Sequence, residues 1–184
     1  MLRRTLVGLV AIGILASFMG IGGFSLFTDT ADNGSNAFTS GSVEISTSPA
    51  SAFLTMSNMA PGDSVTAQLT VSNDGTLQMR YAMTTATTDE DLLDLDQALT
   101  LVIREKGTNP CTTFDGTQVY SGTLKAGVIG DPTPGGDDGD RTLNAHTPED
   151  LCFKVTLPSD AIGPMAAATT ATFTFDAEQT TNNP

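Results

Sequence analysis

Apolar and polar residues alternate with a period of two along much of this chain. A period of two is typical of strands that bury one face, so each such stretch is predicted to be a half-buried β-strand. The clearest stretches are Val65–Val71, Leu77–Met83, Leu151–Leu157 and Ala171–Ala177. Shorter apolar runs predict further strands at Val43–Ser46, Phe53–Met56, Leu99–Glu105 and Gln118–Ser121.

Turn residues and one acidic run interrupt this alternation. Asn73-Asp74-Gly75 lies between two of the alternating stretches, and a glycine can take the positive φ that a tight turn needs, so we expect a hairpin-like connection. The run Asp89–Asp96 has acids at its start and predicts one short helix with a solvated acidic face. Several strands, short turns and no regular alternation with helices predict an all-β fold, a two-sheet β-sandwich with one short helix.

The N-terminal segment differs from the rest in hydropathy. Arg3 and Arg4 precede an uncharged, largely apolar stretch, Thr5–Phe27. A basic start before such a stretch is typical of an export signal, and the small residues near its end favour cleavage between Ser25 and Leu26. A retained membrane anchor is the alternative, because the stretch is long enough to span a bilayer. We expect a secreted protein that touches the membrane only through the uncleaved signal peptide.

Length and charge narrow the classes of function. The 184 residues, 19.1 kDa, suit one domain after the signal peptide. Lys and Arg number 8 against 21 Asp and Glu, a formal net charge of −13, which excludes nucleic-acid binding by phosphate neutralisation. Outside the reducing cytosol, two cysteines in one domain most often pair, so Cys111 and Cys152 are predicted to form a disulfide.

Little in the sequence points to catalysis. His146 is the single histidine, which excludes a two-histidine metal site, and we assign no catalytic residue and no bound cofactor. The glycine-rich stretch GDPTPGGDDGD offers one weak candidate for Ca²⁺, although its spacing does not match an EF-hand. The alternative is a solvated loop that binds no ion. The candidate Ca²⁺ ligands are Asp131, Asp137, Asp138 and Asp140.

Several short segments in order resemble the TasA/camelysin (CalY) family of exported bacterial matrix proteins. They are Gly22–Asp29, Asn36–Ile45, Asn58–Ser64, Val71–Leu77 and, near the C-terminus, Phe175–Gln179. The resemblance implies a jelly-roll-like sandwich, a signal peptide cut by a SipW-type signal peptidase, and a role as the fibre-forming protein of a biofilm matrix. Some members are labelled metallopeptidases, a label that implies a metal site for which this chain has no His-Glu-x-x-His motif.

The resemblance also favours one mode of assembly. The segment after the cleavage site carries two large apolar side chains, Phe27 and Phe38, which would insert into the next copy and build a head-to-tail homo-polymer. The alternative is that this segment forms the first strand of its own domain. The expected organisation is a signal peptide at 1–25, a donor or first-strand segment at 26–40, a sandwich domain at 41–179 and a polar tail at 180–184. The competing functions are a secreted camelysin-type metallopeptidase and a monomeric Ca²⁺-dependent surface-binding module.

Overall fold

The computed structural model describes residues 39–89, 94–161 and 167–181. Within it, Ser40–Pro184 forms one compact unit, distinct from Met1–Thr39. The expected signal peptide, its cleavage site and the segment with Phe27 and Phe38 lie outside the described residues. No helix of the described part is long and apolar enough to cross a membrane.

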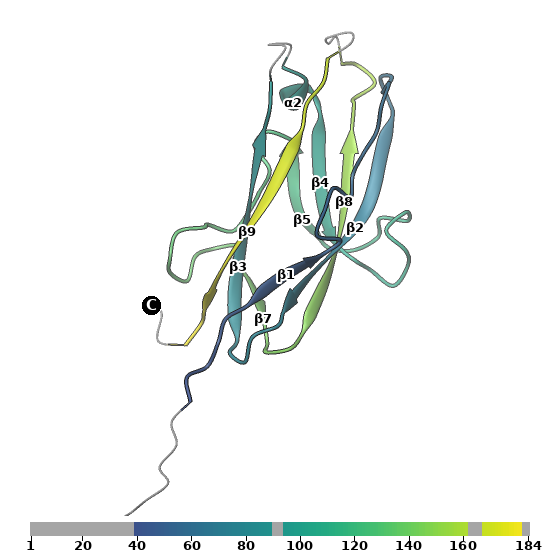
Figure 1. Ribbon diagram of the computed structural model, residues 1–184. Helices are drawn as coiled ribbons and strands as arrows, with labels where there is room; N and C mark the ends of the chain where they lie inside the picture. Colours follow the sequence, from purple (N-terminus) through teal and green to yellow (C-terminus); the bar gives the residue numbers. More distant parts are fainter. Residues whose placement is uncertain (1–38, 90–93, 162–166, 182–184) are drawn as a thin grey trace, which may run out of the picture. The chain divides into compact units, whose positions relative to one another are not determined.

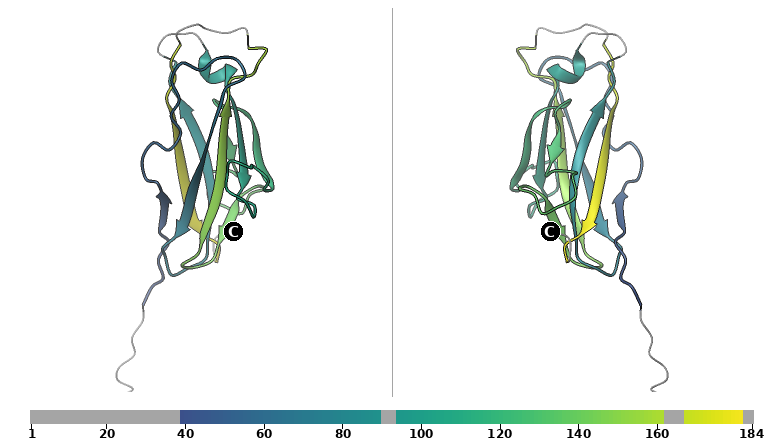
Figure 2. Two further views of the ribbon diagram at one scale, coloured as in Figure 1. Left: turned by 90° about the vertical axis from the view of Figure 1, so that its right-hand side faces the viewer. Right: turned by 90° about the vertical axis from the view of Figure 1, so that its left-hand side faces the viewer.

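Nine strands and one short helix make up the described part of the unit. The strands run lengthwise between the two ends of the unit. The helix α2 lies at one end, at the top of Figure 1, and the turn between β2 and β3 lies at the other, at the bottom; the side views of Figure 2 show the same two ends. In chain order they are β1 (Ile45–Ser48), β2 (Ser64–Asn73), β3 (Met79–Thr87), α2 (Leu95–Ala98), β4 (Thr100–Glu105), β5 (Gln118–Thr123), β6 (Val128–Ile129), β7 (Arg141–Leu143), β8 (Pro148–Thr156) and β9 (Ala171–Gln179).

These strands form two antiparallel sheets, which confirms the predicted two-sheet β-sandwich. One sheet has the order β1-β2-β8-β4-β5. In the other, β3 pairs with β9 along its whole length and with the short strands β6 and β7. The alternating apolar residues of β3 and β8 meet between the sheets, where Met79, Met83 and Phe153 are fully buried.

Three of the sequence-based expectations about local structure are wrong. Residues 53–56 form no strand; they belong to a segment that follows β1, where Phe53 still packs against the core. The acidic run is not a solvated helix face, because the described helix is confined to Leu95–Ala98 and Asp96 is only 1% exposed. The strand expected at Val43–Ser46 is present but shifted to Ile45–Ser48, and it ends where Pro49, which lacks an N–H for the ladder, follows.

The third error concerns the turn at Asn73-Asp74-Gly75. It does not close a hairpin, since β2 and β3 lie in opposite sheets and the turn carries the chain between them. Gly75 is needed for a different reason from the one expected: a Cβ there would lie 2.5 Å from the carbonyl oxygen of Ser42. The backbone of residues 42–44 packs against this turn, and the N–H of Asp74 donates to the Glu44 carbonyl at 2.8 Å.

Candidate functional site

The most distinctive feature of the described surface is an apolar groove between the open edges of the two sheets. The groove encloses about 630 Å³, far more than the ~30 Å³ that one water molecule takes in the liquid. The space is open to solvent on one side, so it is a surface groove and not an interior void. Its apolar lining includes Phe53, Val65, Leu69, Leu99, Leu124, Val155, Phe173 and Phe175.

The groove exists because two strands each have an edge without a partner strand in the described part of the chain. β9 pairs with β3 on one side only. β2 pairs with β8 over nine residues, whereas β1 covers only Thr70–Asn73 on the other side. Ser64–Leu69 of β2 and the outer edge of β9 therefore carry backbone N–H and C=O groups that can pair with another strand.

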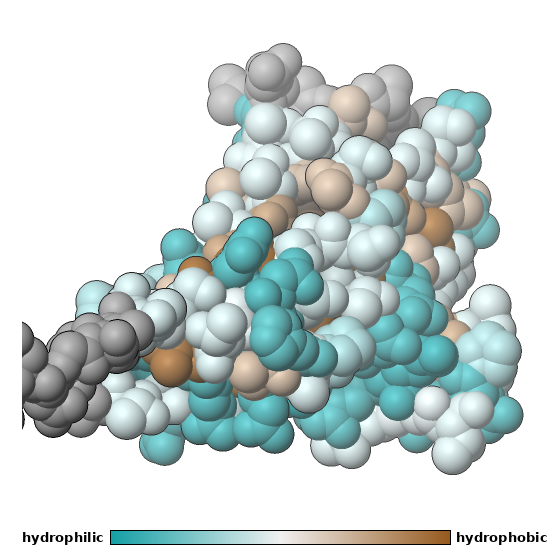
Figure 3. All heavy atoms as spheres, turned by 60° about the horizontal axis from the view of Figure 1, so that its bottom comes forward, coloured by the Kyte–Doolittle hydropathy of each residue, from teal (hydrophilic) through white to brown (hydrophobic). Residues whose placement is uncertain are grey.

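The burial of β9 shows that its apolar face is incompletely covered. Phe173 and Phe175 alternate with exposed residues as core residues do, yet both remain only half-buried. Val65 of β2, on the opposite wall, is also half-buried. In the space-filling view, apolar residues in brown are exposed around a hollow in the middle of this face, with hydrophilic residues in teal below them (Figure 3).

The segment between β1 and β2 fills part of the space between the walls. Phe53 lies 5.1 Å from Phe153 of β8 and 5.8 Å from Phe173 of β9, measured between ring centroids. The rings of Phe153 and Phe173 are 5.2 Å apart, so the three rings form one cluster, of which Phe53 and Phe173 line the groove. Met56, three residues further along, is 41% exposed. Within the described residues, the Phe53 ring thus covers the bottom of the groove, and the space above it remains accessible to solvent.

Sequence reasoning missed this groove. The alternation in Ala171–Ala177 correctly predicts an apolar face, but the pattern is the same whether or not a neighbouring strand covers that face. The unpaired stretch of β2 and the position of Phe53 depend on the residue at which β1 ends. The sequence pattern predicted that end two residues too early. The expected occupants, Phe27 and Phe38, lie outside the described residues, as do Ser25 and Leu26.

The predicted disulfide is present. Cys152 lies on β8 with its side chain 2% exposed, on the face opposite to Leu151 and Phe153, and Cys111 lies in the loop after β4. Their Cα atoms are 5.3 Å apart. The bridge therefore holds the loop between β4 and β5 against the outer face of the larger sheet.

In the acidic loop between β6 and β7, carboxylates accept hydrogen bonds from backbone N–H groups of the same loop. Asp140 accepts from the N–H of Asp131 at 3.0 Å, and Asp131 accepts from the N–H of Thr133 at 2.9 Å. The bond from the N–H of Thr133, and a second from its hydroxyl, hold the pKa of the Asp131 carboxyl below its usual value. Within the described residues, the four candidate Ca²⁺ ligands do not form a group of three with converging oxygens. Binding of Ca²⁺ by this loop stays a prediction.

His146 lies in the turn between β7 and β8. Its side chain is exposed and its φ is 56°. No group of three metal-ligating side chains in the described part of the chain includes it. The geometry around His146 thus offers neither a second imidazole nor a converging set of carboxylates.

Comparison with known proteins places the chain in a family. The family model described as camelysin metallo-endopeptidase matches residues 1–100, and no curated protein matches the chain. The match extends from the N-terminus across β1, β2, β3 and α2, and so includes the β2 wall of the groove and the segment that carries Phe53. Because the model covers more than half of its residues, the chain belongs to the camelysin metallo-endopeptidase family.

Proposed function

We propose that this protein is a secreted structural subunit that assembles head to tail into extracellular fibres of a biofilm or cell-surface matrix. In this proposal, Leu26–Phe38 of one copy lies in the apolar groove of the next. The observation that carries the proposal is the groove itself, an unfilled apolar space between two strand edges that lack partners in the described part of the chain.

The chemistry of the donor segment fits the groove. A strand beside β9 or β2 would satisfy open backbone groups, as in other cases of strand addition. Its two aromatic side chains, Phe27 and Phe38, would bury about 300 Å² together, which corresponds to about 7 kcal/mol before the cost of ordering the segment. The half-buried Phe173 and Phe175 of the acceptor would lose their remaining exposure in the same step.

The positions of the groove and of the chain's entry into the unit favour an open polymer. Ser42 enters beside the β2–β3 turn, where its N–H donates to the hydroxyl of Thr76 at 2.9 Å. The groove extends towards the opposite end, where Leu99 and Leu124 line it. A contact between two different surfaces of identical subunits is heterologous and produces filaments unless the rotation closes a ring. The net negative charge opposes such contacts, so added salt should promote assembly.

The proposal requires export and cleavage. We propose that a SipW-type signal peptidase cuts between Ser25 and Leu26, which frees the donor segment at the new N-terminus. N-terminal sequencing of protein from the culture medium should therefore start at Leu26. A chain that keeps Met1 and stays in the membrane would contradict this part of the proposal.

Filling the groove tests the assembly directly. Ala171 is a partly buried groove-lining residue at the start of β9, so Ala171→Phe should occupy the space meant for the donor. Thr174→Phe adds the same ring on the exposed face of the same strand and serves as the matched control. Electron microscopy should show filaments for the control and none for Ala171→Phe, while both variants unfold cooperatively. Filaments of wild-type abundance from a folded Ala171→Phe protein would refute the role of the groove.

A peptidase is the second candidate, because the family that the chain matches is described as a metallo-endopeptidase. A metallopeptidase needs side chains that hold a metal ion together. The single histidine, His146, is exposed in a turn and does not belong to the group of converging carboxylates in the described part of the chain. We expect purified protein to leave casein intact with or without a chelator, and His146→Ala to behave as wild type. Chelator-sensitive proteolysis that co-purifies with the wild type and disappears in the variant would favour the peptidase.

A further inference from the structure

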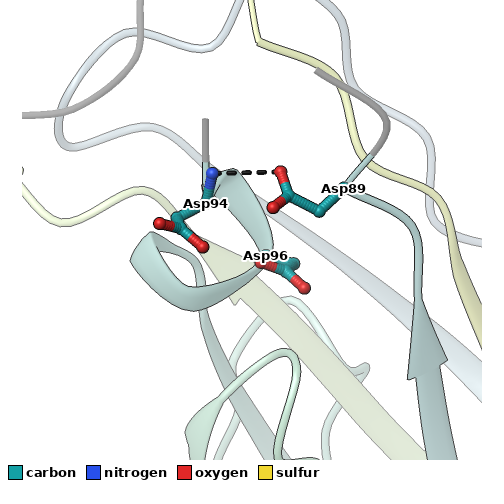
Figure 4. Close-up of side chains that lie close together, drawn as sticks. All are labelled: Asp89, Asp94 and Asp96. Atoms are coloured by element: carbon teal, nitrogen blue, oxygen red, sulfur yellow. Dashed lines mark hydrogen bonds between the residues drawn. The ribbon is translucent and has the colours of Figure 1, made fainter. Parts of the chain in front are cut away.

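Three carboxylates converge at the end of the sandwich that carries α2. Asp89 follows β3, Asp94 immediately precedes α2, and Asp96 lies in its first turn. One oxygen of each lies within 4.8 Å of the other two, and Figure 4 shows the three side chains around the start of the helix. A point central to such a triangle lies at most about 2.8 Å from each oxygen, which small rotations would bring to the 2.3–2.6 Å typical of Ca²⁺ ligands.

An unsatisfied buried oxygen at this place is a second, independent observation. Asp96 is 1% exposed. Its Oδ2 accepts from the hydroxyl of Thr87 at 2.6 Å and lies 3.3 Å from the ammonium of Lys125. Its Oδ1 is buried and has no hydrogen-bond partner of good geometry among the described residues. In Figure 4, Asp94 and Asp89 lie on either side of the start of α2, and the Asp96 carboxylate lies below and between them. An acceptor shut off from water and left unsatisfied is costly, and a cation among the three carboxylates removes that cost.

Charge and donor type select the kind of ion. Lys125 pairs with Asp96, and its one positive charge is smaller than the charge of the three carboxylates together, an imbalance that suits a divalent cation. All donors are oxygens, which favours a hard cation over zinc. Mg²⁺ demands near-ideal octahedral geometry and keeps most of its waters, whereas Ca²⁺ accepts longer bonds and irregular geometry, so three carboxylates from a loop and a short helix suit Ca²⁺ better. We propose that Asp89, Asp94 and Asp96 bind one Ca²⁺ ion, a site separate from the acidic loop between β6 and β7 and independent of the proposed assembly.

Calorimetric titration of Ca²⁺ into chelator-treated protein, purified after expression of the full-length chain, tests the site. Asp94→Asn suits this test, because asparagine tolerates the positive φ of 54° at this position and its amide oxygen can still accept from Gln97. Asp89→Asn is a second single variant, and Asp89→Asn/Asp94→Asn combines them. Asp131→Asn/Asp137→Asn removes the same charge from the acidic loop and is the matched control.

We expect one Ca²⁺ per chain in the wild type and in the control, with a higher melting temperature in Ca²⁺ than in chelator. Each single variant should bind at least about tenfold more weakly, and the double variant should gain no thermal protection, with melting temperatures in chelator close to wild type. Mg²⁺ at equal concentration should protect less. Wild-type affinity in the folded double variant, loss of binding in the loop control alone, or no saturable binding in the wild type would each overturn the proposal.

Discussion

The ring of Phe53 stands edge-on against the ring of Phe153, with 5.1 Å between the centroids and 83° between the planes. Phe53 comes from a segment without strand structure, and Phe153 comes from the middle of β8. The contact therefore joins a loop to the core at the floor of the groove. It explains why the groove has an apolar floor even though β1 stops after four residues.

Removal of the Phe53 ring should destabilise the unit. Phe53→Ala loses two aromatic contacts and leaves a cavity, but the residue is only half-buried, so we expect a loss of about 2 kcal/mol in the free energy of unfolding. Met56→Ala in the same segment should cost less than about 0.5 kcal/mol, because Met56 is exposed. Urea unfolding of the two variants checks this; equal losses would mean that the segment packs as a whole rather than through Phe53.

The disulfide should contribute to stability. Replacement of Cys111 and Cys152 together by alanine should lower the free energy of unfolding by about 2–4 kcal/mol, since the bridge closes a long loop in the unfolded chain. Reduction of the wild type should have a similar effect. Native protein should show no thiol that reacts with an alkylating reagent, and labelling of Cys152 without denaturant would contradict the pairing.

A partly buried polar network joins the two sheets near their lower end. Arg141 of β7 donates to Glu149 of β8 and, at 2.7 Å, to Glu105 of β4. Tyr81 of β3 donates to Glu149 at 2.7 Å, and burial, followed by the charge of Glu149, raises the pKa of this phenol well above its usual value. The tyrosine hydroxyl therefore acts as the donor to Glu149 at neutral pH.

Loss of the central cation of this network should be costly. Arg141→Met leaves Glu149 without its charge partner, and we expect a loss of about 3 kcal/mol in the free energy of unfolding. Lys106→Met removes an exposed ion pair with Asp150, 3.3 Å long, and should cost less than about 1 kcal/mol. The comparison by chemical unfolding at one pH isolates the effect of burial; a cost for Arg141→Met as small as that for Lys106→Met would show that the network is not structural.

Acid should destabilise the fold through two carboxyls. The hydrogen bond from Thr70, and then Lys106, lowers the pKa of Asp150, and Arg141 lowers that of Glu105. Groups whose folded pKa is depressed stabilise the fold above their unfolded pKa of about 4, and this contribution disappears as the pH falls through the folded value. We expect constant stability above about pH 5 and a decline below it.

The variant Thr70→Val measures how much of the loss of stability in acid comes from Asp150. Without the hydroxyl, the pKa of Asp150 should move back towards its usual value, so stability at pH 6 should be lower and the loss between pH 5 and pH 3 smaller than in wild type. Unfolding curves across this pH range give both quantities. An unchanged slope would mean that Thr70 does not hold the Asp150 carboxylate.

Much of the fold is predictable because alternation of apolar residues depends only on local sequence. The apolar faces of β3 and β8 and the disulfide were predicted correctly. The error at Asn73-Asp74-Gly75 has a physical reason: a turn signal does not specify which strands pair. Asn73 is buried and its amide donates to the carbonyls of Leu77, Leu143 and Asn144, so this turn is fixed by contacts from a distant part of the chain.

The candidate sites were harder to predict for the same reason. β6 and β7 have two and three residues, too few to show a period, and they exist because β3 offers them an edge. Asp96 stands in an acidic run that indicates a solvated surface, but Thr87 and Lys125 come to it through the fold and bury it. The groove depends on the lack of a second partner strand for β9 in the described part of the chain, which no residue of β9 encodes.

Electron microscopy of mature protein that lacks Leu26–Phe38 tests the central claim most directly. The sandwich from Ser40 onwards keeps both sheets, the disulfide and the groove, so the shortened protein should remain a folded monomer. Without a donor segment it should form no filaments under conditions in which the full mature chain, Leu26–Pro184, assembles. Filaments of the shortened protein like those of the full mature chain would contradict assembly by donation of the N-terminal segment.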